Sequence, residues 1–211
     1  MIIALVNQKG GPGKTALTYN LAGILSELEP VTALDTDPQG SLTAAWTLRS
    51  REIPVIVAAD PSFPLNHPAL DAPLCLVDTP PGHEKHARKA LALADLALVP
   101  LTPSPLDLMA SLPLLAMAAE AKRINPSLQV LAVFNQVKAN ATLRETIAGM
   151  AREKGFAVAQ TWIPHTVAVS EAFLEGLPLN YARPTHPAVE FFRELAREAM
   201  EVVAYGQDEG R

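Results

Sequence analysis

Residues 2–15 read IIALVNQKGGPGKT, an apolar strand that runs directly into a glycine-rich loop. A strand, such a loop and a following helix are what a phosphate-binding loop requires, because glycine lets the backbone wrap closely around phosphate oxygens. The positive end of the helix dipole lies at the same place. In this pattern the Lys14 ammonium reaches the β- and γ-phosphates of a nucleotide, and the Thr15 hydroxyl is a ligand for Mg²⁺. The sequence therefore predicts a nucleotide site at the start of the first helix.

Short, continuous apolar runs recur along the chain, as expected for strands buried on both faces. They are residues 2–6, 31–34, 55–58, 74–77, 96–100, 130–134 and 158–162. Helical patterns lie between them, at 15–28 and after a capping box that opens at Thr142 and buries Leu143, Ile147 and Met150. This alternation is typical of right-handed βαβ units. We therefore predict an α/β fold, doubly wound, with a mostly parallel sheet flanked by helices.

The composition narrows the class of protein further. Of 211 residues, 49% are apolar and 18% are charged, which excludes a disordered chain, and the net charge of −5 excludes a uniformly basic nucleic-acid coat. A single cysteine, Cys75, excludes a disulfide framework and a thiolate zinc site. Without a leader or an apolar run of about 20 residues, we expect one cytoplasmic domain over 1–205 and a polar tail over 206–211.

The loop departs from the strict Gly-x-x-x-x-Gly-Lys-Thr pattern in an informative way. Gln8 stands where that pattern has its first glycine, and Lys9 precedes Gly10 and Gly11. This variant resembles the deviant Walker motif of the ParA/MinD class of ATPases, which implies ATP and Mg²⁺ as cofactors. The resemblance also implies that Lys9 reaches across a nucleotide-sandwich homodimer to the partner's phosphates. The remaining phosphate contacts that it implies are backbone groups of Gly10, Gly11, Gly13 and Ala16.

Two further predicted strands are followed by aspartates, and the resemblance implies a function for each of them. Asp37, in the segment Asp-Thr-Asp-Pro-Gln after the second strand, looks like the carboxylate that positions the attacking water. Asp78, which ends the strand at 74–77, resembles a Walker B residue that holds Mg²⁺ through water, and Gly82 then lets the backbone approach the γ-phosphate. The carboxyl ends of parallel strands form the ligand edge of an open α/β sheet. We expect all three motifs to meet there.

Three later segments extend the resemblance to nearly the whole chain. Residues 102–107 read TPSPLD, a box similar to that of short plasmid partition ATPases (the ParF-like branch). The resemblance gives Asn135 as the residue that reads adenine and Pro164 as one that packs on the base. Because Pro113 follows the box, we expect the next helix to begin with Ser111 as its N-cap.

The expected partners follow from the resemblance and from the charge pattern. We expect no helix-turn-helix extension before the phosphate loop, so sequence-specific DNA recognition would belong to a centromere-binding, ParB-like adaptor. Between Lys122 and Lys154, six basic residues face two acidic ones, a stripe that fits either non-specific DNA binding or an ordinary solvated surface. The helix that opens at Pro187 carries glutamates on its polar face, which disfavours a membrane surface.

The resemblance implies a slow, partner-stimulated ATPase that dimerises with Mg-ATP and binds nucleoid DNA during plasmid or chromosome partitioning. Two alternatives stay open at this stage. The same switch can position a protein cargo such as a microcompartment, and the same fold can carry an ATP-dependent metabolic synthetase. The synthetase would need a substrate pocket beside the γ-phosphate, for which 211 residues leave little chain.

Overall fold

The computed structural model describes residues 1–138 and 141–209. In this part of the chain seven strands form one sheet in the order β3-β2-β4-β1-β5-β6-β7, and every neighbouring pair is parallel. The strands are β1 (Ile2–Leu5), β2 (Val31–Asp35), β3 (Val55–Ala59), β4 (Cys75–Asp78), β5 (Leu96–Leu101), β6 (Gln129–Phe134) and β7 (Ala157–Val158). The predicted fold class is confirmed, and the sheet is parallel throughout.

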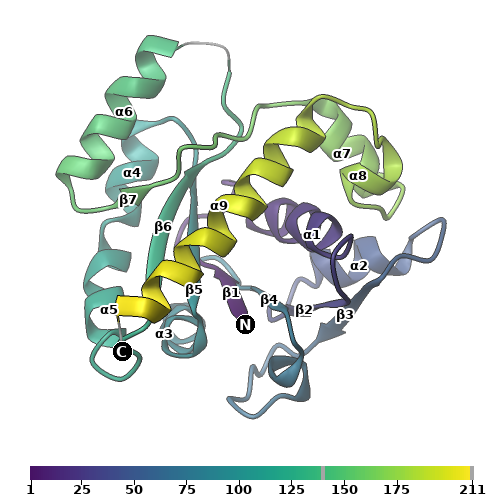
Figure 1. The fold of residues 1–211 in the computed structure, drawn as a ribbon, viewed down its shortest axis with the longest axis horizontal. Coiled ribbons are helices and arrows are strands. Elements are labelled where there is room, and N and C mark those ends of the chain that lie inside the picture. Colours follow the sequence, from purple (N-terminus) through teal and green to yellow (C-terminus); the bar gives the residue numbers. More distant parts are fainter. Residues whose placement is uncertain (139–140, 210–211) are drawn as a thin grey trace.

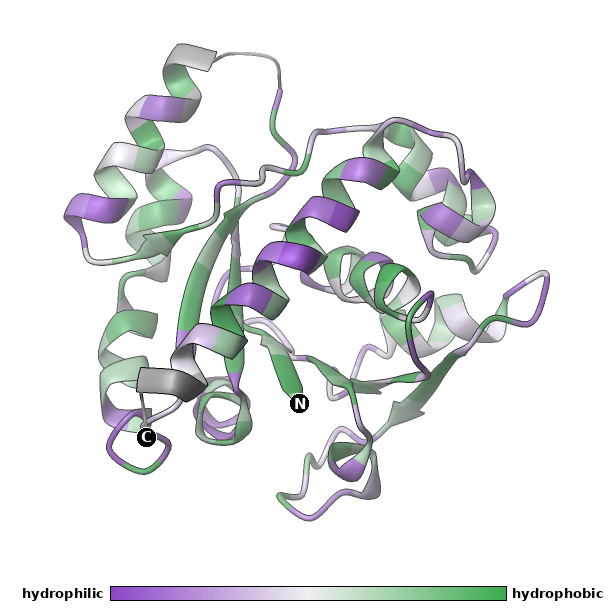
Figure 2. Ribbon diagram, viewed as in Figure 1, coloured by the Kyte–Doolittle hydropathy of each residue, from purple (hydrophilic) through white to green (hydrophobic). Residues whose placement is uncertain are grey.

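Helices cover both faces of this sheet (Figure 1). One face holds α1 (Lys14–Leu25), α2 (Ser41–Thr47), α7 (Val167–Leu174), α8 (Leu179–Ala182) and α9 (Ala188–Glu209). The other holds the short 3₁₀ turn η1 (Pro68–Asp71), α3 (Glu84–Leu93), α4 (Pro105–Ser111), α5 (Pro113–Ala121) and α6 (Ala141–Glu153). A hydrophobic core lies on each face of the sheet, the first under α1 and the second under α3. Alternate residues of β1 point into the two cores: Ile3 and Leu5 into the first, and Ala4 into the second. This is why the strands read as unbroken apolar runs, which Figure 2 shows in green.

The C-terminal helix α9 packs its apolar stripe into the first core. Val189, Phe192, Ala196, Ala199 and Val203 are all buried there. Its polar face points outward, as Figure 2 shows in purple. The apolar stripe of α9 therefore serves core packing. No helix in the described ranges has the length and apolar character to cross a membrane.

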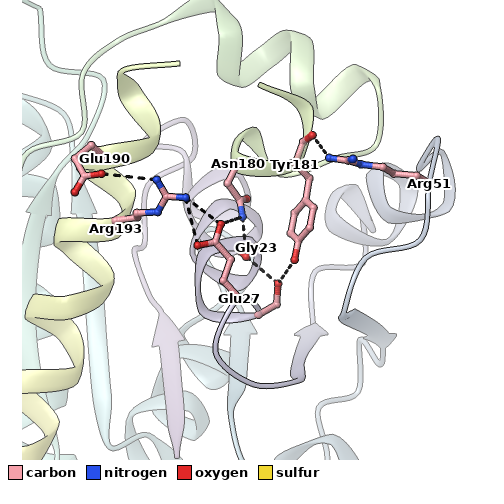
Figure 3. A network of polar contacts seen from close by, with 8 residues as sticks. Gly23, Glu27, Arg51, Asn180, Tyr181, Glu190 and Arg193 are labelled. Carbon is pink, nitrogen blue, oxygen red and sulfur yellow. Dashed lines mark hydrogen bonds and ion pairs between the residues drawn. The ribbon is translucent and has the colours of Figure 1, made fainter. Parts of the chain in front are cut away.

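A network of polar contacts fixes α1 against α8 and α9 (Figure 3). The Asn180 amide donates to the Gly23 carbonyl and to Glu27, both at 2.9 Å, and Arg193 also donates to Glu27, at 3.2 Å. At Gly23 an added Cβ would lie 2.4 Å from Pro178, so only glycine lets the helices approach this closely. The network holds α1, which begins at the phosphate loop, rigidly against the C-terminal part of the chain.

The structure corrects several expected boundaries. The run at 158–162 lies in β7 only at Val158; beyond it, the Ala159 and Ile163 N–H groups still donate to carbonyls of β6, and Trp162 stacks on Phe134 (ring centroids 4.5 Å apart). The helix α4 ends at Ser111 and α5 begins at Pro113, so Ser111 is not an N-cap; its hydroxyl donates instead to the Asp107 carbonyl at 2.9 Å.

Two helix predictions also need revision. In α6, Ile147 is buried and Met150 half-buried as expected, but Leu143 is 44% exposed. The side chain of Thr142 lies outside the described residues, and the helix begins one residue before it. At the other end of the chain α9 extends to Glu209, into the segment expected to be a polar tail; the domain bounds 1–205 stay a prediction, and residues 210–211 lie outside the described ranges.

Candidate nucleotide site

A cleft with two connected compartments lies at the carboxyl ends of the strands. The larger, about 570 Å³, is bounded by the loop residues 10–16, by Asp37 and Ser41, and by Pro81. The smaller, about 190 Å³, is bounded on one side by Asn135 and Gln136. The motif residues expected to meet at this edge of the sheet therefore do so.

The phosphate loop uses glycine where the backbone requires it. Gly11 and Gly13 adopt φ values of +95° and +83°, which side-chain-bearing residues rarely reach. Gly13 is also the N-cap of α1, so the first helical N–H groups point toward the cleft. An added Cβ at Gly13 would lie 2.5 Å from the Asn135 amide nitrogen. Gly10, Gly11, Gly13 and Ala16 all line the cleft as predicted.

Lys14 is a buried cation at the floor of the larger compartment. Its side chain lies beneath the loop, and its ammonium group donates to the Lys9 carbonyl at 3.3 Å. Burial lowers the pKa of Lys14, and the negative charges of Asp78 and Asp37 oppose that shift. Because the Lys14 ammonium group is largely excluded from water, it interacts strongly with any anion that enters the cleft.

Thr15 and Asp78 are joined as expected for a metal-holding pair. The Thr15 hydroxyl donates to Asp78 Oδ2 at 2.7 Å, and the Thr18 hydroxyl donates to Asp78 Oδ1 at 3.3 Å. Burial raises the pKa of Asp78 to about 7, with Asp35 adding to the rise, although the Thr15 hydrogen bond opposes it. Hydroxyl and carboxylate oxygens are the ligands that Mg²⁺ prefers, with water and substrate phosphate completing its shell. The donor set therefore fits Mg²⁺.

Asp35 has a structural role that the sequence analysis did not assign. Its buried carboxylate accepts hydrogen bonds from the Asp37 N–H at 3.1 Å and from the Thr43 N–H and hydroxyl at 2.9 and 2.8 Å. These bonds fix the loop that carries Asp37 and the first turn of α2. Asp37 itself is half-buried and lines the cleft, where its carboxylate accepts from the Gln39 N–H at 2.9 Å.

The loop after β4 is tied to the phosphate loop. The Gly82 N–H donates to the Gln8 carbonyl at 2.7 Å, and Gly82 adopts a φ of +69°. In the described chain Pro81, rather than Gly82, lines the cleft. The predicted approach of Gly82 to the γ-phosphate stays a prediction, and in this structure its N–H is already engaged.

Lys9 precedes the glycines that line the larger compartment, and its side chain pairs with a residue of its own chain. Its ammonium group forms an ion pair with Asp107 of α4, and Thr102 donates to the same carboxylate. Burial alone would raise the pKa of Asp107, but the hydrogen bonds from Lys9 and Thr102 outweigh it and hold that pKa below its usual value. The Lys9 side chain is 46% exposed, whereas that of Asp107 is buried.

At the smaller compartment, two neutral amides hold the phosphate loop. Asn135 donates to the Pro12 carbonyl at 2.8 Å and accepts from the Gln136 N–H at 2.9 Å, while the Gln136 amide donates to the Gly11 carbonyl at 2.9 Å. Gln136 adopts a left-handed φ of +59°. Pro164 lines the same compartment. Contact of Asn135 and Pro164 with adenine stays a prediction, and the structure adds a bracing role that the sequence did not reveal.

The opposite wall of the cleft is α7, which is anchored to α1 and α2. Phe173 packs edge-to-face on Tyr19 of α1, with ring centroids 6.0 Å apart, and the Tyr19 hydroxyl donates to the Gly176 carbonyl at 2.7 Å. Burial raises the pKa of that hydroxyl, so it stays a donor. Gly176 leaves no room for a side chain, since an added Cβ would lie 2.3–2.5 Å from backbone atoms of Arg49, Ala45 and Leu48.

The residues of the basic stripe are spread over two helices on one side of the sheet. Lys122 and Arg123 follow α5, and Arg152 and Lys154 lie at the end of α6 (Figure 1). These four side chains and that of Lys138 are exposed, and the Arg144 side chain lies outside the described residues. Contact of the stripe with DNA stays a prediction.

Comparison with known proteins decides the family. A model described as the CobQ/CobB/MinD/ParA nucleotide binding domain matches residues 3–179. The chain belongs to this family. Proteins of the ParA/MinD type are nucleotide-binding ATPases, so the resemblance drawn from the deviant loop is confirmed at that level.

Two curated relatives of this ParA/MinD-family chain match it over most of their length. It is 30% identical, over 235 aligned positions and 94% of both chains, to the chromosome-partitioning ATPase Soj of Thermus thermophilus. It is 29% identical over 182 positions, 83% of this chain and 84% of the other, to the maintenance of carboxysome distribution protein A of Halothiobacillus neapolitanus. The solved structure of MinD from Pyrococcus horikoshii, complexed with Mg-ADP, has a TM-score of 0.73 at 20% identity over 97% of this chain and 98% of that one, a likeness of fold.

Proposed function

We propose that this protein is a Mg-ATP-dependent ATPase that dimerises in its ATP state and positions a cargo, as a slow switch that a partner protein stimulates. The observation that carries the proposal is the pair of lysines at one phosphate loop. Lys14 is buried and lines the cleft, whereas Lys9, five residues earlier on the same loop, is half-exposed. A monomer uses the first for phosphate binding, and the second is available to a nucleotide held by another copy.

Each predicted site residue has a place in this scheme. Lys14 neutralises the β- and γ-phosphates, and loop N–H groups bind their oxygens. Thr15 and Asp78 would hold Mg²⁺, which neutralises the charge that develops on the phosphates during transfer. Asp37, whose loop Asp35 fixes, would orient the attacking water. Because this machinery only positions and neutralises, a missing contact from a second copy would keep hydrolysis slow in the monomer.

Closing the dimer requires that Lys9 leave Asp107. The Lys9 ammonium is half-exposed but Asp107 is buried, so separating the pair carries a desolvation cost, which the hydrogen bond from Thr102 reduces. The partner's triphosphate carries more negative charge than one carboxylate and so offers Lys9 stronger charge-assisted contacts. We therefore expect Lys9 to exchange Asp107 for the partner's nucleotide when two ATP-loaded copies meet, and to return to Asp107 once they separate.

The first experiment measures molar mass by light scattering with Mg-ATP, Mg-ADP or no nucleotide. The wild type should dimerise only with Mg-ATP, and Lys9→Ala should stay monomeric while still binding the nucleotide. Lys122→Ala, which removes an exposed lysine remote from the cleft, is the matched control. Normal ATP-dependent dimers of Lys9→Ala would contradict the cross-dimer role.

A second variant tests the assignment of Asp37. Asp37→Ala should bind Mg-ATP but fail to turn it over, because its water is no longer oriented, and the ATP-bound dimer should therefore accumulate. Phosphate release and light scattering on the same sample give both readouts. Unchanged turnover would remove Asp37 from the reaction.

The cargo is either DNA or a protein assembly, since the relatives' names include both chromosome partitioning and carboxysome distribution. We propose that the ATP dimer binds nucleoid DNA non-specifically, with the stripe between Lys122 and Lys154, and that a ParB-like adaptor stimulates hydrolysis and release.

Binding to random duplex DNA should require Mg-ATP and weaken steeply with salt. Reversal of Lys122 and Arg123 to glutamate should abolish it, and unchanged binding would place the DNA contact elsewhere. A tagged copy should accompany the nucleoid only in the ATP state.

A further inference from the structure

The two compartments of the cleft meet over a short stretch of wall. Four residues line both compartments: Gly13, Ala16, Val169 and Ser170. A nucleotide with its phosphates at the glycine-rich loop and its base beside Asn135 has its sugar at this junction. Ser170 is the one described junction residue with a polar side chain. Any direct side-chain hydrogen bond to the sugar from the junction must therefore come from Ser170.

The Ser170 hydroxyl is available for such a contact. The residue is exposed toward the cleft, and within the described part of the chain its hydroxyl makes no hydrogen bond. This contrasts with the other serines and threonines near the cleft floor, such as Thr15 and Thr18, whose hydroxyls are bound to Asp78. A serine hydroxyl can donate and accept, which matches the dual character of a ribose hydroxyl.

The helix that carries Ser170 is held in a fixed position relative to the phosphate loop. Thr166 caps the start of α7, Phe173 packs on Tyr19, and Gly176 is pressed against the backbone at the end of α2. Just beyond, the Leu179 N–H donates to Asn20 of α1 at 2.8 Å. Because α1 begins at the phosphate loop, these contacts set the distance between Ser170 and the phosphate site.

We propose that Ser170 recognises the sugar of the bound nucleotide by a hydrogen bond to a ribose hydroxyl, and so makes the site prefer ribonucleotides over deoxyribonucleotides. The inference rests on the proposed function, since it presupposes that the cleft binds ATP. A net hydrogen bond between neutral groups corresponds to a preference of about two- to tenfold. Ser170 is a specificity residue with no part in the chemistry of hydrolysis.

The test compares affinities for ATP, 2′-deoxyATP and 3′-deoxyATP, each with Mg²⁺, by calorimetry. The wild type should bind at least one deoxy analogue about two- to tenfold more weakly than ATP, and the analogue that loses affinity identifies the hydroxyl. In Ser170→Ala this preference should disappear through weaker binding of ATP, with the affinity for that analogue unchanged. Ser170→Thr retains a hydroxyl and should restore part of the preference. Ser50→Ala, an exposed serine outside the cleft, is the matched control.

The outcomes separate the two levels of the proposal. Equal wild-type affinities for all three nucleotides, or a preference that survives in Ser170→Ala, would overturn sugar recognition while leaving ATP binding intact. A parallel loss for all three nucleotides in Ser170→Ala would also overturn it, because it would indicate a packing role for α7. No binding of any adenine nucleotide by the wild type would instead refute the proposed function itself.

Discussion

The two ends of the nucleotide cleft are built from different chemistry. At the phosphate end, buried charged groups face one another, with Lys14 near Asp78 and the Thr15 hydroxyl on that carboxylate. At the base end, the neutral amides of Asn135 and Gln136 hold backbone carbonyls of the same loop. The contrast indicates that the first end supplies binding energy to an anion, whereas the second end maintains the shape of the loop.

The largest expected effect belongs to the phosphate end. Lys14→Ala removes the buried cation, and we expect ATP affinity to fall by about 10³-fold, as when a charge-assisted contact is lost in a water-poor site. Calorimetry with Mg-ATP measures the loss. The control is Lys89→Ala, since Lys89 lies on α3 and donates to carbonyls of residues 62 and 63, away from the cleft. A loss below tenfold would mean that the backbone N–H groups dominate.

A pH series of stability tests the buried charge at the same end without ligands. Because burial raises the pKa of Asp78 to about 7, the folded protein keeps a proton that the unfolded chain releases near pH 4. This group therefore makes the free energy of unfolding fall as pH rises from about 4 to about 7. Asp78→Asn removes that part of the pH dependence.

The expected result is that Asp78→Asn becomes more stable relative to wild type by a few kcal/mol between pH 5 and pH 8, at about 1.4 kcal/mol for each unit of pKa shift. Urea denaturation in metal-free and nucleotide-free buffer gives both curves. Parallel curves for the two proteins would show that Asp78 has an ordinary pKa.

The contact between the two ends is tested by a pair of glycine variants. Gly11→Ala and Gly13→Ala both place a side chain at positive φ, which costs about 1 kcal/mol. At Gly11 no atom lies within 4 Å of the added Cβ, but at Gly13 the Asn135 amide lies 2.5 Å away. Gly13→Ala should therefore lose about 1–3 kcal/mol more stability than Gly11→Ala. Equal losses, measured by urea denaturation, would mean that Asn135 moves aside freely.

The smallest expected effect lies at the base end. Gln136→Ala removes one amide hydrogen bond to the Gly11 carbonyl, on a partly exposed residue. A bond of this kind contributes about 0.5–1.5 kcal/mol, so ATP affinity should fall about two- to tenfold through a loosened loop. Gln39→Ala, an exposed glutamine whose side chain makes no hydrogen bond within the described residues, is the control. A loss of ATP affinity as large as that caused by Lys14→Ala would mean that the two ends contribute equally to ATP binding.

The same contrast explains how much the sequence could predict. The meeting of Lys14, Thr15 and Asp78 at one end of the cleft could be predicted because their motifs follow a fixed order of strand, loop and helix. The strands were visible because residues buried on both faces leave continuous apolar runs. What Asn135 and Gln136 bind was not visible, because their partners are backbone carbonyls, which have no signature in the sequence.

The errors in the fold have a related cause. The segment around Trp162 has the apolar character of a strand, yet β7 ends at Val158, and the segment beyond it makes separate backbone hydrogen bonds to β6 while Trp162 stacks on Phe134. Pro113 indicated a helix start correctly but not the neighbouring helix that ends at Ser111. Asp35 and Asp37 look equivalent in the sequence. In the structure Asp35 accepts a hydrogen bond from Thr43 of α2, whereas Asp37 lines the cleft.

Gly176 bears directly on how the cleft could open. Its backbone touches the end of the helix that follows the Asp37 loop, with no clearance for even a methyl group. A shift of that helix when the γ-phosphate is lost would therefore displace the wall that carries Phe173. Release of inorganic phosphate from the phosphate end would thus also weaken the contacts of α7 with the nucleoside. Phosphate release would then favour dissociation of the remaining nucleotide.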